Sequence, residues 1–125
     1  MKLEEIVPPL EMCKRIPEGS FENSALVWAI RFCARGYASG NIVIALRHDI
    51  EDSDGHRILS PAPTLAEIMA ELDKRWDDVC MWNDAAKNWW DIQVENIKTA
   101  ETHGKRDRNS AAAALRLWLE VNGIE

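Results

Sequence analysis

Residues 109–125, NSAAAALRLWLEVNGIE, decide the fold, because they contain a start signal, an apolar stripe and a stop signal for one helix. The side chain of Asn109 can accept a hydrogen bond from a free amide of the first turn, and the alanine run behind it has the highest helix propensity. Gly123 stands where a left-handed residue ends a helix, and Ile124 can fold back on Leu119. The stretch therefore predicts a helix between Asn109 and Gly123.

The apolar residues of this helix recur at three- and four-residue spacing, which is typical of a helix with one buried side. Arg116 and Glu120 lie on the opposite side. The predicted buried stripe consists of Ala111, Ala114, Leu115, Trp118, Val121 and Asn122, widened by Ala112 and Leu119. We expect the rest of the chain to supply the surface that covers this stripe.

Length and charge limit the architecture and the class of partner. A chain of 125 residues suffices for one domain and is short for two, so we expect a single domain over residues 1–125. The formal charge of −6 argues against a protein that follows nucleic-acid phosphates, because such proteins concentrate positive charge. Lys105, Arg106 and Arg108 form a local basic cluster interrupted by Asp107, which we expect to be solvated.

The chain contains no run of about 18 apolar residues, and its first residues, MKLEEI, are acidic. We therefore expect a soluble, cytoplasmic protein without a membrane partner.

The chain has an odd number of cysteines, which are widely spaced and form no CxxC pair: Cys13, Cys33 and Cys80. This spacing predicts three free thiols.

The first half of the chain predicts a short helix and a hairpin. Prolines bracket a helix of about two turns at Leu10–Ile16. Residues 25–33, ALVWAIRFC, alternate with period two, which favours a strand; a helix that ends at Gly36 is the alternative. Asn41–His48 alternates in the same way, so the two runs predict an antiparallel hairpin. His56–Ser60 is a candidate third strand.

The second half predicts a helix, a second hairpin and a loop. Thr64 and Glu67 have the spacing of a capping box, so a helix begins at Leu65. Residues 79–82 and 88–95 flank a turn-like linker and predict the hairpin, whereas residues 96–108 are polar and aperiodic and predict a long loop. The expected fold is α+β, with one mainly antiparallel sheet of four or five strands, two longer helices and one short N-terminal helix.

Three blocks of sequence resemble small proteins encoded by bacteriophages and prophages of gut bacteria. The blocks are IPEGSFENSALVW at Ile16–Trp28, PAPTLAEIMAEL at Pro61–Leu72 and AAAALRLWLEVNGI at Ala111–Ile124. Where such proteins commonly have a proline after the capping asparagine, this chain has Ser110, which alters the first turn only slightly. The resemblance implies a phage-related origin, one compact fold and the cytoplasm of a bacterial host. It implies no activity, cofactor or catalytic residue.

The sequence contains no clear catalytic or metal-binding motif. The acidic segment DIEDSDG at residues 49–55 does not fit a calcium loop, because Ile50 and Pro61 would occupy the first and last ligand positions. The GxSxG motif, glycine-rich phosphate loops and the usual spacings of zinc ligands are all absent. We therefore predict no catalytic residue, metal or cofactor. The alternative is a small metal-dependent hydrolase that uses His48, Asp49, Asp52 and Asp54.

The predicted binding site is a pair of tryptophans in the second hairpin. If residues 84–87 form a four-residue turn, Trp82 lies opposite Trp89 and Met81 opposite Trp90. One face of the hairpin is then apolar, with Val79, Met81, Trp90, Ile92 and Val94. The other face carries Cys80, Trp82, Trp89, Asp91, Gln93 and Glu95.

Two interpretations of this tryptophan pair remain open. Trp82 and Trp89 can brace the hairpin or lie under the first helix, or they can anchor a protein interface, where tryptophan is enriched. On the second interpretation the partner is a host or phage protein, or another copy of the chain. The predicted function is then that of a non-catalytic phage or prophage accessory protein that acts through protein–protein interaction.

Overall fold

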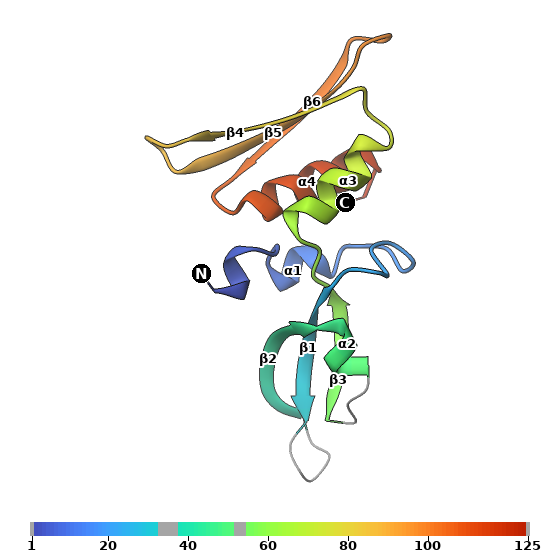
Figure 1. Cartoon of the computed structure of the whole chain (residues 1–125), viewed down its shortest axis with the longest axis vertical. Coiled ribbons are helices and arrows are strands. Elements are labelled where there is room, and N and C mark those ends of the chain that lie inside the picture. The colour runs from blue at the N-terminus through green and yellow to red at the C-terminus, as the bar shows by residue number, and fades with distance from the viewer. Residues whose placement is uncertain (1, 33–37, 52–54, 125) are drawn as a thin grey trace.

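The computed structural model of this protein describes residues 2–32, 38–51 and 55–124. Its two three-stranded antiparallel sheets lie at opposite ends of an elongated molecule, with the helices between them (Figure 1). The predicted α+β class is confirmed. The prediction of one sheet with four or five strands is wrong, because the two predicted hairpins belong to different sheets. None of the helices in the described ranges is both long and apolar enough to cross a membrane.

The first sheet has the strand order β2-β1-β3. Its central strand, β1 (Leu26–Phe32), pairs antiparallel with β2 (Ala38–Leu46) and with β3 (His56–Pro61). The predicted hairpin and third strand are therefore confirmed, and the helical alternative for residues 25–33 is wrong over the part that the structure describes. The side chain of Ile50 from the short helix α2 (Arg47–Glu51) packs on one face of this sheet.

The N-terminal segment covers part of the other face of the first sheet. It contains a 3-10 turn, η1 (Leu3–Glu5), and the helix α1 (Leu10–Cys13), which is shorter than predicted. Val7, which follows η1, packs with Leu26 in a small apolar cluster. The indole of Trp28 donates a hydrogen bond of 3.2 Å to the carbonyl oxygen of Pro8.

The second sheet has the strand order β4-β5-β6. It consists of β4 (Asp78–Asp84), β5 (Trp89–Asn96) and β6 (Glu101–Asp107). The predicted hairpin is confirmed as β4 and β5, but the predicted loop at residues 96–108 is wrong, because β6 occupies most of it. One face of this sheet packs on the C-terminal helix α4 (Ser110–Val121).

The strand β6 has no apolar alternation because ion pairs attach it to α4. Lys105 Nζ lies 3.0 Å from a carboxylate oxygen of Glu120, and Arg116 Nε lies 3.1 Å from Asp107. The residues of β6 that point toward the helix are thus polar, although they are partly buried. A search for apolar residues with period two cannot detect such a strand.

The predicted start and stop of α4 are both confirmed. The Asn109 side chain accepts a hydrogen bond of 3.0 Å from the Ala112 amide. Gly123 has a φ of +71°, and the Ile124 amide donates to the Leu119 carbonyl oxygen at 2.9 Å. This last bond closes the helix end in the way that a Schellman motif does.

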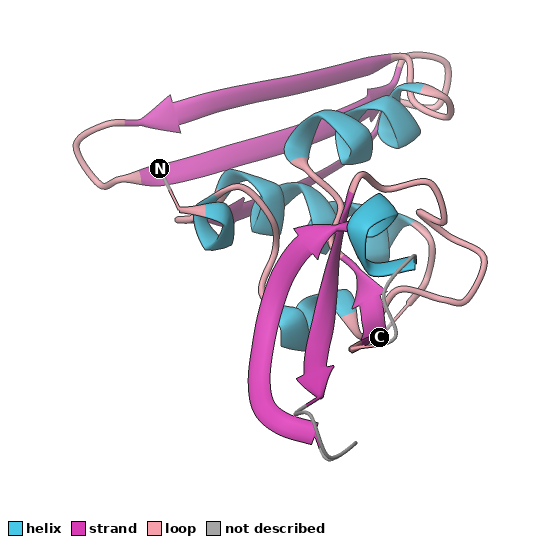
Figure 2. Ribbon diagram, turned by 60° about the horizontal axis from the view of Figure 1, so that its bottom comes forward, coloured by secondary structure: helices cyan, strands magenta, loops and turns pink. Residues whose placement is uncertain are grey.

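The helix α4 is buried on two opposite sides rather than on one. Leu115 and Leu117 are both fully buried, although residues two apart point in directions that differ by about 200°. The strands β5 and β6 contact α4, as do α1 and α3 (Leu65–Asp73), so the helix lies inside a layered core (Figure 2). Trp118, a member of the predicted stripe, is only partly buried and lies at the margin, with its ring centroid 4.9 Å from that of Phe21.

The predicted capping box of α3 also links the two ends of the molecule. The Thr64 amide donates to one carboxylate oxygen of Glu67 at 2.8 Å, and the Glu67 amide donates to the Thr64 hydroxyl at 3.4 Å. The other carboxylate oxygen of Glu67 accepts from the amide of Ala25, just before β1, at 3.1 Å. One side chain therefore fixes both the helix start and the entry to the first sheet.

Cys13 and Cys80 are free thiols, as predicted, whereas Cys33 lies outside the described residues. Cys13 is fully buried between α1 and the core around α4. Burial raises the pKa of Cys13 to about 12, although a side-chain hydrogen bond with Trp28 acts in the opposite direction. The folded protein therefore holds this thiol in its protonated form over a wide pH range.

We expect alkaline pH to destabilise the fold through Cys13. Below pH 9.0 the thiol is protonated in the folded and the unfolded chain, and its stabilising effect is complete. Between about pH 9 and pH 12 only the folded chain retains the proton, so the unfolding free energy falls as pH rises. At about pH 10.5 the loss is about 2 kcal/mol.

Urea unfolding at about pH 8 and about pH 10.5 measures this loss. Cys13→Ala should remove this part of the pH dependence. Cys80→Ala, which changes an exposed thiol, should retain it. An equal loss of stability at high pH in Cys13→Ala and in the unmodified protein would show that other groups cause it.

Candidate functional site

The predicted register of β4 and β5 is wrong by two residues. Trp82 pairs with Asp91 and Asp84 pairs with Trp89, so the two tryptophans are not opposite each other. The turn occupies residues 85–88 because Asn88 adopts a φ of +56°, which asparagine tolerates better than most residues. A shift of two residues does not exchange the faces of a strand. The predicted division of the hairpin into two faces is therefore confirmed.

The two faces of the second sheet have different surroundings. Ile92 and Val94 on the inner face are buried in the core that surrounds α4. Trp82 on the outer face is 48% exposed. Because the helices of the described chain contact only the inner face (Figure 1), the interpretation that Trp82 lies under the first helix is wrong.

A row of three side chains crosses the outer face from edge to edge. Trp82 of β4 lies beside Asp91 of β5, which in turn pairs with Arg106 of β6. Arg106 Nε donates to Asp91 Oδ1 at 2.9 Å, and the Asp91 side chain is only 16% exposed. The hydrogen bond with Asp91, and then the charge of Asp91, raise the pKa of Arg106. Because of this ion pair, one negative and one positive charge lie beside the indole of Trp82.

A hollow of about 250 Å³ lies on this face over β5 and β6. Gly104 is opposite Gln93, so it has no side chain at the position where other residues of β6 would fill the surface. A Cβ atom built on Gly104 would lie 3.5 Å from the Ile92 carbonyl oxygen, which is ordinary contact. The hollow is lined by Trp82, Asp91, Ile92, Gln93, Gly104, Lys105 and Arg106. It is large enough to receive a side chain of a partner.

The second tryptophan of the pair has a different environment. Trp89 is partly buried, and the guanidinium carbon of Arg108 lies 5.4 Å from the centre of its ring. This is the geometry of a cation–π contact. Trp89 thus contacts Arg108 at the end of the sheet, whereas Trp82 is the more exposed of the two tryptophans.

The predicted solvated cluster of basic residues is divided by the pleat of β6. Lys105 points toward α4, while Arg106 belongs to the outer face with Trp82. Gly104, Arg106 and Arg108 were not among the predicted site residues, because their segment lacks the apolar pattern of a strand. The one local signal was charge: Arg106 is a basic residue that can pair with an aspartate of the preceding strand.

Cys80 lies on the same outer face but has the wrong protonation state for a nucleophile. Its Sγ lies 3.4 Å from Asp78 Oδ2. The hydrogen bond with Asp78, together with nearby negative charge, raises the pKa of Cys80 above its ordinary value. The reactive thiolate is therefore disfavoured at neutral pH.

The residues of the alternative metal site are not brought together in the described chain. His48 and Asp49 lie in the helix α2, so the predicted strand Asn41–His48 is wrong at His48 and the turn expected from Asp49 onward is helical at its start. Adjacent residues of a helix do not face each other. Asp52 and Asp54 lie outside the described residues. Within the described ranges, no group of three histidine, cysteine or acidic side chains is arranged to hold a metal ion.

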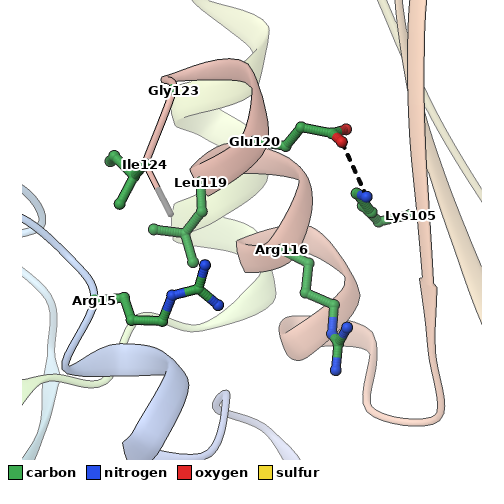
Figure 3. A pocket seen from close by; sticks show the side chains of 7 residues that line it. All are labelled: Arg15, Lys105, Arg116, Leu119, Glu120, Gly123 and Ile124. Carbon is green, nitrogen blue, oxygen red and sulfur yellow. Dashed lines mark ion pairs between the residues drawn. The ribbon is translucent and has the colours of Figure 1, made fainter.

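A second hollow, of about 410 Å³, lies beside the C-terminal half of α4 (Figure 3). It is lined by Arg15, Lys105, Arg116, Leu119, Glu120, Gly123 and Ile124. Figure 3 marks the ion pair of Lys105 with Glu120, and Arg116 pairs with Asp107 outside the view. Because carboxylates neutralise two of the three cations, this hollow is a weaker candidate for anion binding than the cations alone would indicate.

No protein-family model, no curated protein and no solved structure matches the chain. The candidate site therefore depends on the geometry of the outer face alone.

Proposed function

We propose that this protein is a non-catalytic interaction protein and that the outer face of the second sheet binds another protein. The observation that carries the proposal is Trp82, a large aromatic side chain that is 48% exposed on a sheet face uncovered by the described helices. Burial of this indole by a partner would remove apolar surface from water, and tryptophan is enriched among the residues that contribute most to binding at protein interfaces. Trp82 is the anchor, and the hollow over Gly104 receives a side chain of the partner.

The composition of this face supports a protein partner. Tryptophan and arginine are the residues most enriched at the centres of protein interfaces, and the face carries Trp82, Trp89, Arg106 and Arg108. The Asp91–Arg106 ion pair leaves little net charge beside Trp82, so desolvation of this part of the face has a moderate cost. Gln93 is exposed and provides both donors and acceptors at the rim.

We propose further that the partner is a host or phage protein. This part of the proposal rests on the resemblance of three sequence blocks to proteins of bacteriophages and prophages. A phage accessory protein of this kind acts in the cytoplasm of its host.

The test is capture of a partner by variants of the outer face. Trp82→Ser should reduce the amount of captured partner about tenfold or more, because tryptophan truncations at interface centres typically cost 2 kcal/mol or more. Its melting temperature should stay close to that of the unmodified protein, since Trp82 is exposed. Tagged protein, host lysate and quantitative mass spectrometry provide the measurement.

Met81→Ser is the matched control for this experiment. Met81 is the neighbour of Trp82 on β4, is 40% exposed and points to the opposite face. Its substitution should leave capture unchanged. Equal capture by Trp82→Ser and Met81→Ser would refute the proposed site. A large fall in the melting temperature of Trp82→Ser would show that this indole belongs to the core.

A further inference from the structure

The edge strand β2 differs from the three other edge strands of the described sheets. Edge strands expose unpaired backbone groups, and proteins protect them with charged residues or proline. β3 contains Arg57 and Pro61, β4 begins and ends with aspartate, and β6 contains both acidic and basic residues. The nine residues of β2, ASGNIVIAL, include no charged residue and no proline. This edge therefore lacks the usual protection against pairing.

Two of the exposed large apolar side chains of the described chain lie on β2. Ile42 is 47% exposed and Leu46 is 51% exposed. Both lie on the face that the N-terminal segment covers only in part, since Ile44 between them packs against the cluster that contains Val7. The apolar surface thus continues from this face to the open edge of the sheet.

We propose that β2 pairs with β2 of a second copy of the chain, so that the first sheets of two copies join into one continuous sheet. An antiparallel pair with a two-fold axis at Ile44 places Ile42 of one copy beside Leu46 of the other. Ile42 of each copy then packs against Leu46 of the other copy, so the interface contains this apolar contact twice. The backbone groups at the open edge gain hydrogen-bond partners in the same step.

The absence of charged residues from β2 makes this edge compatible with a second copy of the chain. The chain has a formal charge of −6, so two copies repel each other over most orientations. Because β2 has no charged residue, no like charges meet along the two paired strands. The edge is also self-complementary, because its apolar residues alternate as Ile42, Ile44 and Leu46 around the proposed axis.

The proposal is independent of the outer face of the second sheet. The two sheets lie at opposite ends of the molecule (Figure 1), so a dimer through β2 leaves both copies of the Trp82 face open. Each copy in the dimer then presents one partner site, and the two sites lie far apart.

Sedimentation equilibrium over concentrations from about 1 to 300 μM tests the dimer, since this range brackets the micromolar affinities typical of modest interfaces. The unmodified protein should dimerise within this range. Ile42→Lys should raise the dissociation constant about tenfold or more, because lysine on an edge strand opposes pairing. Ile97→Lys is the matched control: it makes the same substitution at a residue that is 72% exposed outside the first sheet, and dimerisation should be unchanged.

Hydrogen exchange of the backbone amides identifies the strand that pairs. In the unmodified protein, residues 41–46 should exchange more slowly at high concentration than at low concentration. In Ile42→Lys this difference should disappear, and Leu46→Lys should behave in the same way if the first variant folds poorly. A protein that stays monomeric over the whole range overturns the proposal. So does a dimer that survives both lysine variants, or one that Trp82→Ser dissociates.

Discussion

Replacing Leu115 with alanine is expected to lower the unfolding free energy by about 3 to 4 kcal/mol. Leu115 is fully buried in α4, and its truncation loses apolar burial and leaves a cavity, a change that costs about 2 to 5 kcal/mol in well-packed cores. The surroundings have little freedom to collapse into that cavity, because α4 contacts the strands β5 and β6 as well as the helices α1 and α3. The expected loss therefore lies above the lower limit of this range.

The next residue of the same helix provides the control for this prediction. The Arg116 side chain is 52% exposed and pairs with Asp107. Arg116→Ala removes an exposed ion pair, which is worth about 0 to 1 kcal/mol. Urea unfolding of the two variants gives both losses. If Leu115→Ala costs no more than Arg116→Ala, α4 is not the centre of the core.

The helix α4 shows what a local sequence pattern can predict. Its capping residue, its alanine run and its terminal glycine each act on backbone groups only a few residues away, and the sequence predicted the effect of all three correctly. The extent of burial was underestimated, although a signal was present. Ala113 and Leu117 lie outside the predicted stripe and are apolar, and a helix that is apolar on nearly all sides is buried on nearly all sides.

Local sequence patterns did not predict which strands join into one sheet. Both hairpins and β3 were predicted from alternation and turn residues, but which strands share a sheet depends on contacts between residues far apart in the chain. The strand β6 was missed because ion pairs such as that of Lys105 with Glu120 replace apolar contacts with α4.

The sequence predicted only part of the candidate site, because local patterns place a side chain on a face of its strand but do not identify its neighbours on other strands. Trp82 was placed on the correct face because side-chain alternation along a strand is local. Its neighbours Gly104 and Arg106 come from the strand that was missed. The register error arose at Asn88, whose positive φ moved the turn by one residue and the pairing by two. One strand and one turn residue thus account for most of what the sequence did not predict about the site.

The second large effect is expected at Asn109, which does more than cap α4. Its side-chain oxygen accepts from the Ala112 amide, while its side-chain nitrogen donates to the carbonyl oxygen of Val7 at 2.9 Å. Val7 is fully buried, so its carbonyl has no access to water as a replacement donor. Loss of a cap costs about 1 kcal/mol, and an unsatisfied buried carbonyl costs about 1 to 3 kcal/mol. We therefore expect Asn109→Ala to cost about 2 to 3 kcal/mol.

Asn109→Asp separates the two roles because it has nearly the same shape. Aspartate is as good a capping residue as asparagine and is favoured at a helix N-terminus. It has no donor for Val7, and it places a negative oxygen against the carbonyl oxygens of Val7 and Glu4. If the link to the N-terminal segment matters, Asn109→Asp should lose about 2 kcal/mol in urea unfolding, and the amides of residues 2–8 should exchange faster. If Asn109 is only a cap, this variant should be as stable as the unmodified protein, and that result would refute the link.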